Sequence, residues 1–257
     1  MKRSFTPVGV LPMLLLLIIT ACKKQTETYP SDPVSAYMNL APGKYVRYRL
    51  DSTVYIFFGQ RDTTISYQAK DVVDTLVTDA AGHPGWRVIR YLRDTASTNE
   101  ADWRAATTYL VTSSFPTIEV YEDYLRFVKL KDPVYNGYSW LGNSYLPYQP
   151  YDVTIGFSND QPMPGWEYTY QNVGATLTIN GKSYPNTISV LQAQDSTNVP
   201  ITAPDVLASK DYWIEKYAKG IGLVYKEVIM WEYQPASGPN PGYYNGFGIK
   251  MSIIDHN

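Results

Sequence analysis

The side chains that most often carry out catalysis are scarce in this sequence. It contains one cysteine and two histidines, His83 in a turn rich in glycine and proline and His256 as the penultimate residue. Serine nucleophile elbows, zinc-protease motifs and phosphate-binding loops are absent. One cysteine excludes an internal disulfide, and two separated histidines exclude a His-rich metal site. We therefore predict no catalytic residues, no metal site and no cofactor.

Paired carboxylates are the remaining route to acid–base chemistry, because glycoside hydrolysis needs only two carboxyl groups at the right separation. The candidates lie on expected strands or in the turns between them: Asp71, Asp74, Glu119, Glu122, Asp123 and Glu227. None of them belongs to a recognisable motif. Solvated strand faces explain these residues more simply than a catalytic pair does.

Cys22, the only cysteine, follows directly on an apolar stretch. Lys2 and Arg3 precede residues 8–19, which are apolar except for one glycine and one proline. This run is shorter than the roughly 20 apolar residues of a membrane span and has the length of a signal-peptide core. It ends in Ile-Thr-Ala-Cys, which resembles the lipobox of bacterial lipoproteins. We predict a signal peptide over 1–21 and acylation of Cys22; a secretory signal without lipidation is the alternative.

Composition and charge limit the partners of the mature chain. The formal net charge is −2 and no basic block is present, so nothing indicates binding to nucleic acid. Residues 22–41 are mostly polar with two prolines, as in a flexible linker. We therefore expect attachment to the membrane through the acylated cysteine. The expected location is the cell envelope at the outer membrane, with the periplasmic side and the cell surface both open.

The elements that would position any site are β-strands. In residues 45–58, Val46, Tyr48 and Leu50 share one face of the expected strand, whereas Arg47 and Arg49 share the other. Similar short runs recur about every ten to fifteen residues, with no helical period between them. This pattern favours an antiparallel meander over alternating strands and helices. We predict one all-β domain over 42–257, a curved sheet or open half barrel with little helix.

Two local signals refine this pattern. Asn180-Gly181 stands between two β-like runs, and both residue types tolerate the positive φ angles of a tight hairpin turn. We therefore predict a hairpin centred on this pair. One helical turn is expected over 206–210, after Pro204.

Tyrosine is unusually frequent, with 24 tyrosines against seven phenylalanines. Many of them lie in residues 134–165, a long stretch that is also rich in glycine and proline. Long loops on a rigid sheet often carry function, and aromatic rings with a polar tip suit mixed ligands. We predict a binding surface formed by Tyr138, Trp140 and Tyr148. An irregular cover over one end of the sheet is the alternative.

Four segments together carry a resemblance to a known family. They are the lipobox, the strand over 43–52, the Trp-Leu-Gly-Asn segment over 140–143 and the hairpin over 217–227. With them the chain resembles a family of uncharacterised lipoproteins from Bacteroidota, over most of its mature length. The resemblance implies an all-β domain and carries no catalytic residues, because that family has no established activity. The hairpin also resembles envelope proteins with a curved sheet similar to that of lipoprotein carriers, which concerns fold and not function.

Three functions are compatible with these observations. The first and preferred one is a non-enzymatic binding module for a small molecule, a glycan or a protein, and an apolar cavity of several hundred Å³ would indicate a carrier. The second is a structural or interaction subunit of the envelope without a ligand pocket. The third is a carbohydrate-active protein that uses a carboxylate pair.

Overall fold

The structure is a computed structural model that describes residues 31–79, 82–151 and 162–257. It is 64% strand and 5% helix, which confirms the prediction of an all-β fold with little helix. The expected signal peptide and Cys22 lie outside the described residues. Acylation of Cys22 therefore stays a prediction.

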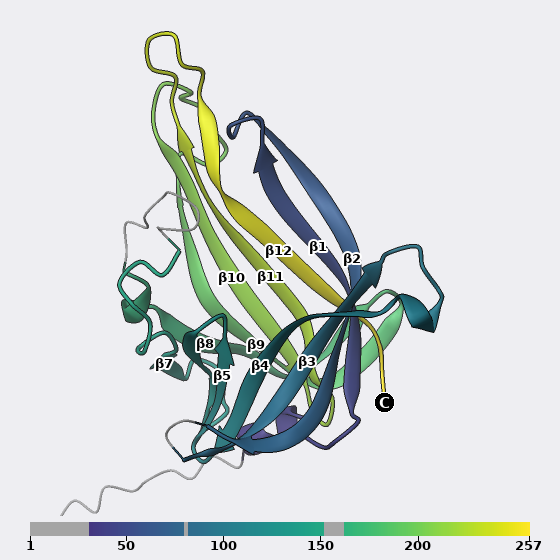
Figure 1. Cartoon of the computed structure of the whole chain (residues 1–257). Coiled ribbons are helices and arrows are strands. Elements are labelled where there is room, and N and C mark those ends of the chain that lie inside the picture. The colour runs from purple at the N-terminus through teal and green to yellow at the C-terminus, as the bar shows by residue number, and fades with distance from the viewer. Residues whose placement is uncertain (1–30, 80–81, 152–161) are drawn as a thin grey trace, which may run out of the picture.

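In the described residues, twelve antiparallel strands form one sheet that curls until it is nearly closed into a barrel (Figure 1). The strands are β1 (Tyr45–Ile56), β2 (Arg61–Thr78), β3 (Pro84–Asp94), β4 (Arg104–Ser114), β5 (Thr117–Glu122), β6 (Leu125–Lys131), β7 (Ser139–Leu141), β8 (Glu167–Ile179), β9 (Lys182–Thr197), β10 (Ala208–Ala218), β11 (Gly222–Gln234) and β12 (Tyr243–His256). Three short 3-10 helices accompany them in the same ranges: η1 (Val34–Tyr37), η2 (Glu100–Asp102) and η3 (Met163–Gly165).

The sheet is a meander in which the first and last strands pair with each other. Its order is β6-β5-β4-β3-β2-β1-β12-β11-β10-β9-β8-β7, so the two edges are β6 and β7. Strands that are consecutive in the chain are therefore neighbours in the sheet, except for β6 and β7. Because β6 and β7 are also consecutive in the chain, the sheet lacks only one strand pairing to be a closed ring.

Side chains and backbone join the two edges at what we call the seam, formed by Val128, Lys131, Trp140, Gly142 and Tyr170. The Val128 amide donates to the Gly142 carbonyl at 2.8 Å, and the Trp140 indole N–H donates to the Val128 carbonyl at 2.8 Å. The Tyr170 hydroxyl accepts from the Lys131 amide at 2.9 Å and donates to its carbonyl at 3.1 Å. These bonds occupy backbone groups that an exposed edge strand would leave unpaired.

The strand predicted over 45–58 forms as β1 but ends at Ile56. Phe57 and Phe58 instead form the turn into β2, with φ angles of 51° and 56°. The hairpin predicted at Asn180-Gly181 is confirmed, with φ angles of 51° and 76° that suit a type I′ turn. The helical turn predicted over 206–210 is wrong, because β10 begins at Ala208 and pairs there with β11.

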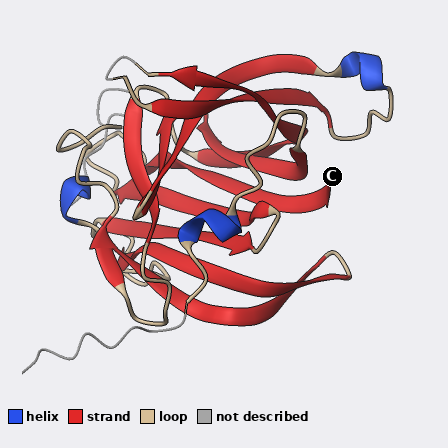
Figure 2. Ribbon diagram, turned by 90° about the horizontal axis from the view of Figure 1, so that it is seen from below, coloured by secondary structure: helices blue, strands red, loops and turns tan. Residues whose placement is uncertain are grey.

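The folded domain begins earlier than residue 42, which corrects the linker predicted over 22–41. Val34 and Tyr37 are each 3% exposed and belong to the hydrophobic core. The Gly220 amide donates to the Ala36 carbonyl at 2.8 Å, and the Val34 amide donates to Asp132. These contacts hold η1 across the lower opening of the curled sheet, as the view from below shows (Figure 2). η1, in the last part of the expected linker, is therefore packed on the folded domain and is not part of a flexible tether.

The main hydrophobic core lies inside the curl. Val88 on β3 and Val111 on β4 belong to the same cluster as Trp213 on β10 and Val228 on β11. Because β3 and β4 are not neighbours of β10 and β11 in the sheet, these side chains meet across the interior. Charged side chains also lie inside the curl, at the end where η1 lies.

Candidate functional site

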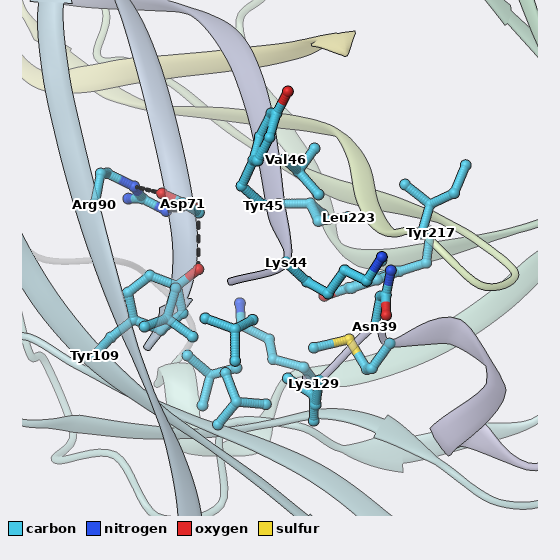
Figure 3. Close-up of a pocket in the computed structure, with 18 of the residues that line it drawn as sticks. Asn39, Lys44, Tyr45, Val46, Asp71, Arg90, Tyr109, Lys129, Tyr217 and Leu223 are labelled. Atoms are coloured by element: carbon cyan, nitrogen blue, oxygen red, sulfur yellow. Dashed lines mark hydrogen bonds and ion pairs between the residues drawn. The ribbon is translucent and has the colours of Figure 1, made fainter. Parts of the chain in front are cut away.

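The inner face of the sheet encloses a cavity of about 100 Å³ at the end where η1 lies (Figure 3). Strands β1–β6 line one side, β10 and β11 line the other, and residues 38–44 line it from below. Its walls carry four cations and three carboxylates: Lys44, Arg90, Lys129, Lys226, Asp71, Glu122 and Glu215.

One network centres on Arg90, which binds two carboxylates. Its guanidinium donates to both oxygens of Asp71, at 2.7 and 2.8 Å, and to Glu122 at 2.9 Å. The Tyr109 hydroxyl donates to Asp71 at 3.0 Å (Figure 3). Bidentate pairing of this kind fixes geometry as well as charge. Asp71 and Glu122 are therefore both held by the guanidinium of Arg90, which lies between them.

A second network centres on Glu215. The Lys129 ammonium donates to its Oε1 at 2.9 Å, and the Tyr217 hydroxyl donates to its Oε2 at 2.7 Å. Lys226 Nζ lies 3.6 Å from the same Oε1, which is an ion pair without a close hydrogen bond. Glu215 and Lys129 are 3% and 5% exposed. This ionic cluster is thus inside the protein.

The strand pairing explains how these side chains reach the interior. Asp71 lies directly opposite Arg90 in the β2–β3 ladder, and Glu215 lies directly opposite Lys226 in the β10–β11 ladder. Residues opposite each other in antiparallel strands share a face. The β5–β6 ladder skips Lys129, which makes it the extra residue of a β-bulge. Bulges redirect a side chain, and this one turns Lys129 towards Glu215.

The pKa directions show which groups carry charge. Burial alone would raise the pKa of Glu215, but the charges of Lys129 and Lys226 outweigh it and lower that pKa to about 2. Burial would also raise the pKa of Glu122, but the charges of Arg90, Lys226 and Lys129 together outweigh it and lower that pKa. Burial lowers the pKa of Lys129 against the attraction of Glu215. Both glutamates are therefore ionised at neutral pH and hold no proton to donate.

Of the six carboxylates considered as a catalytic pair, Asp71 and Glu122 enter the cavity together. The others have separate surroundings: Asp74 pairs with Arg87, Glu119 pairs with Arg126, Glu227 accepts a hydrogen bond from Tyr225, and Asp123 lies in the turn between β5 and β6. The two in the cavity are bound to one arginine. This is an arrangement for fixed charge and not for an acid and a base that exchange a proton.

The three aromatic residues predicted as a binding surface have different positions. Trp140 is 5% exposed and its indole N–H is used at the seam. Tyr138 is half-buried and stacks on Trp140 and Tyr170, with ring centroids 6.1 and 6.4 Å apart. Tyr148 is 63% exposed. Trp140 also has a structural role at the seam, and binding by Tyr138, Trp140 and Tyr148 stays a prediction.

The cavity is smaller and more charged than the apolar cavity expected of a carrier. Sequence reasoning did not single out Lys129, Glu215 or Lys226. Extending the predicted hairpin over 217–227 in register would have placed Tyr225 opposite Glu215, because the β10–β11 ladder shifts by one residue between Lys216 and Tyr217. A bulge in the β5–β6 ladder likewise breaks the alternation at Lys129.

Within the described ranges, no helix has the length and apolar character needed to cross a bilayer. Among the same residues, no three His, Cys, Asp or Glu side chains are grouped so that they could hold a metal ion.

No family model and no curated protein matches the chain. Several solved structures are similar to it, among them one from Desulfovibrio piger and one from Vibrio parahaemolyticus. A DUF1329 family protein from Desulfovibrio piger ATCC 29098 is 12% identical over 88% of this chain and 93% of that chain, with a TM-score of 0.20. A domain from Vibrio parahaemolyticus, described as an outer membrane lipoprotein-sorting protein, is 11% identical over 84% of this chain and 85% of that chain, with a TM-score of 0.19. Likeness at this level says nothing of the ligand or activity of this chain.

Proposed function

We propose that this protein is an envelope lipoprotein, tethered through acylated Cys22, whose curled sheet binds a small polar ligand in the cavity beside η1. It is a binding module and not an enzyme. The observation that carries this proposal is the cavity itself, which lies among buried charged side chains from both halves of the sheet.

Stability alone gives no reason for such an interior. Replacing a buried ion pair by well-packed apolar residues is often neutral or stabilising. This protein instead keeps Lys129, Glu215, Asp71 and Arg90 around a space that apolar side chains could fill. A polar ligand supplies a reason to keep them. A volume of about 100 Å³ suits a small compound, or one end of a larger one whose remainder lies outside.

The proposed tether places the cavity on the membrane side. Asp32, close to the start of the described residues, pairs with Lys219 beside the lower opening at 2.6 Å. Ten residues from Cys22 to Asp32 span at most about 35 Å when fully extended. The end with the cavity would therefore face the membrane, and the opposite end would point away from it.

The carbohydrate-active alternative has little support from the site. A glycosidase needs one carboxyl group that holds a proton near neutral pH. The pKa of Glu122 is lowered, and both Asp71 and Glu122 are bound to Arg90. These residues serve better as a fixed polar wall.

A ligand screen with a cavity-filling variant tests the proposal. We expect ligand-detected NMR with the full chain to find small polar compounds whose signal is lost in Leu40→Trp, because Leu40 lines the cavity. Leu76→Trp, at an exposed position outside the cavity, is the matched control and should retain binding. The proposal fails if no compound distinguishes the two variants while both remain folded.

An interaction subunit is the second candidate, and one observation favours it. Phe57 and Phe58, at the turn between β1 and β2, are 62% and 96% exposed. Both have positive φ angles, which are costly for bulky residues and often mark functional positions. If this turn binds a partner, Phe57→Ser/Phe58→Ser should abolish a pull-down that Leu40→Trp leaves intact.

A further inference from the structure

We infer that the cavity binds an oxyanion, a carboxylate or a phosphate group, through the ammonium groups of Lys44, Lys129 and Lys226. This inference rests on the proposed function and names the chemistry of its ligand. It follows from how the charges in the cavity are shared.

Cations outnumber carboxylates in the cavity. The side formed by β1–β6 carries two cations, Arg90 and Lys129, and two carboxylates, Asp71 and Glu122. On the β10–β11 side Lys226 lies beside Glu215, and Lys44 lines the cavity from below. Four cations against three carboxylates give the whole lining one net positive charge. An anion is therefore stabilised beside the lysines.

These lysines have hydrogen-bond donors to spare. An ammonium group has three N–H donors, and Lys129 uses one of them on Glu215. Lys226 lies 3.6 Å from Glu215, beyond a normal hydrogen bond. The Lys44 side chain makes no ion pair or hydrogen bond within the described part of the chain. Burial makes unused donors expensive, so Lys129 in particular favours an acceptor from a ligand.

The arrangement also accounts for the size of the ligand group. A carboxylate or a phosphate has few heavy atoms and offers several acceptor oxygens to separate donors. A cavity of about 100 Å³ accommodates such a group. Lys44 is half-buried and lines the cavity together with Lys129 (Figure 3). The oxyanion can belong to a free compound or to a lipid headgroup.

Dissociation constants for defined oxyanions test this inference on the full chain in an uncharged detergent. Inorganic phosphate, acetate and the short-chain lipid dihexanoyl-phosphatidylglycerol are titrated by NMR at constant ionic strength, because screening would otherwise mask the effect. We expect Lys44→Met to weaken phosphate binding about tenfold or more, as loss of a charged hydrogen bond does. Lys226→Met should act in the same direction. Lys250→Met, an exposed lysine outside the cavity, is the matched control and should change binding less than twofold.

Comparison of these probes distinguishes a free oxyanion from one on a lipid headgroup. Binding of phosphate and acetate alone indicates a free anion, whereas displacement of phosphate by the phosphatidylglycerol, but not by dihexanoyl-phosphatidylcholine, indicates an anionic headgroup. The inference is overturned if none of the three probes binds, or if Lys44→Met and Lys226→Met bind as Lys250→Met does. If a neutral compound still binds in a manner lost in Leu40→Trp, the proposed function stands and only the oxyanion is wrong. If no compound does, both fail.

Discussion

Lys129 on β6 and Glu215 on β10 are 86 residues apart in the chain and form an ion pair of 2.9 Å across the interior of the sheet. β6 is one edge of the sheet and β10 belongs to the other half, so no strand pairing links them. This ion pair therefore links the two halves of the sheet through the interior, whereas the seam links them at their edges. It also forms part of the wall of the cavity.

Breaking this pair from one side should be costly. We expect Lys129→Met to lower the free energy of unfolding by about 3 kcal/mol, because it removes the nearest cation of a buried carboxylate and leaves only Lys226 at 3.6 Å. Lys129→Met/Glu215→Leu should recover much of that loss, since both charges are then gone. Urea unfolding of the full chain measures both values.

An exposed ion pair provides the control for that experiment. Lys219→Met removes the partner of Asp32, where both side chains are 42% exposed, and should cost about 1 kcal/mol or less. Equal losses in Lys129→Met and Lys219→Met would show that Lys129 is solvated and that the interior pair is not formed.

Acid should weaken the fold through Glu215. Its pKa is lowered from 4.5 to about 2 in the folded protein, so its stabilising effect is complete above pH 4.5 and is lost as the pH falls towards 2. A shift of this size corresponds to about 3 kcal/mol. Between pH 5 and pH 2.5, the unfolding free energy of Glu215→Gln should fall less steeply than that of the native chain. Parallel curves for the two proteins would exclude this role of Glu215.

The seam makes a separate prediction about Trp140. Trp140→Phe keeps an aromatic ring but removes the N–H that binds the Val128 carbonyl, and should cost about 1–3 kcal/mol. Tyr148→Phe, at an exposed position on the same long segment, should change stability by less than about 0.5 kcal/mol. Thermal unfolding of the two variants compares them directly. A neutral Trp140→Phe would mean that the seam does not depend on this bond.

Lipidation of Cys22 is tested by detergent phase partitioning. The chain should partition into the detergent phase when expressed in a bacterial host, because more than one acyl chain gives persistent membrane attachment. Cys22→Ser should move to the aqueous phase. Recovery of both proteins from the aqueous phase would contradict acylation.

The sequence predicts the strands of this fold better than it predicts the site. Alternation in β1 and the turn chemistry of Asn180-Gly181 are local signals, and both are found in the structure. The start of the domain was placed too late because the polar composition of residues 22–41 hides two core residues, Val34 and Tyr37. Their burial depends on partners more than 90 residues away in the chain, among them Asp132.

The cavity was not predicted for a related reason. Trp140 was predicted to contact ligand because it lies in a Tyr-rich segment, and that stays a prediction. Its contact with Val128, on the opposite edge of the sheet, has no signal in that segment. Lys129 and Glu215 carry no motif, and only closure of the sheet brings them together. Contacts made by closure have no local signature in the sequence.

The proposed function requires that the cavity beside η1, and not the Tyr-rich segment or the Phe57-Phe58 turn, holds the ligand. Methyl NMR of the full chain, titrated with the strongest compound from the screen, tests it most directly. We predict saturable shifts at Met38, Val46 and Leu223, which line the cavity. Leu141 and Ile56, beside the two alternative surfaces, should stay unchanged. Shifts confined to Leu141 or Ile56, with the cavity methyl groups unaffected, would contradict the claim.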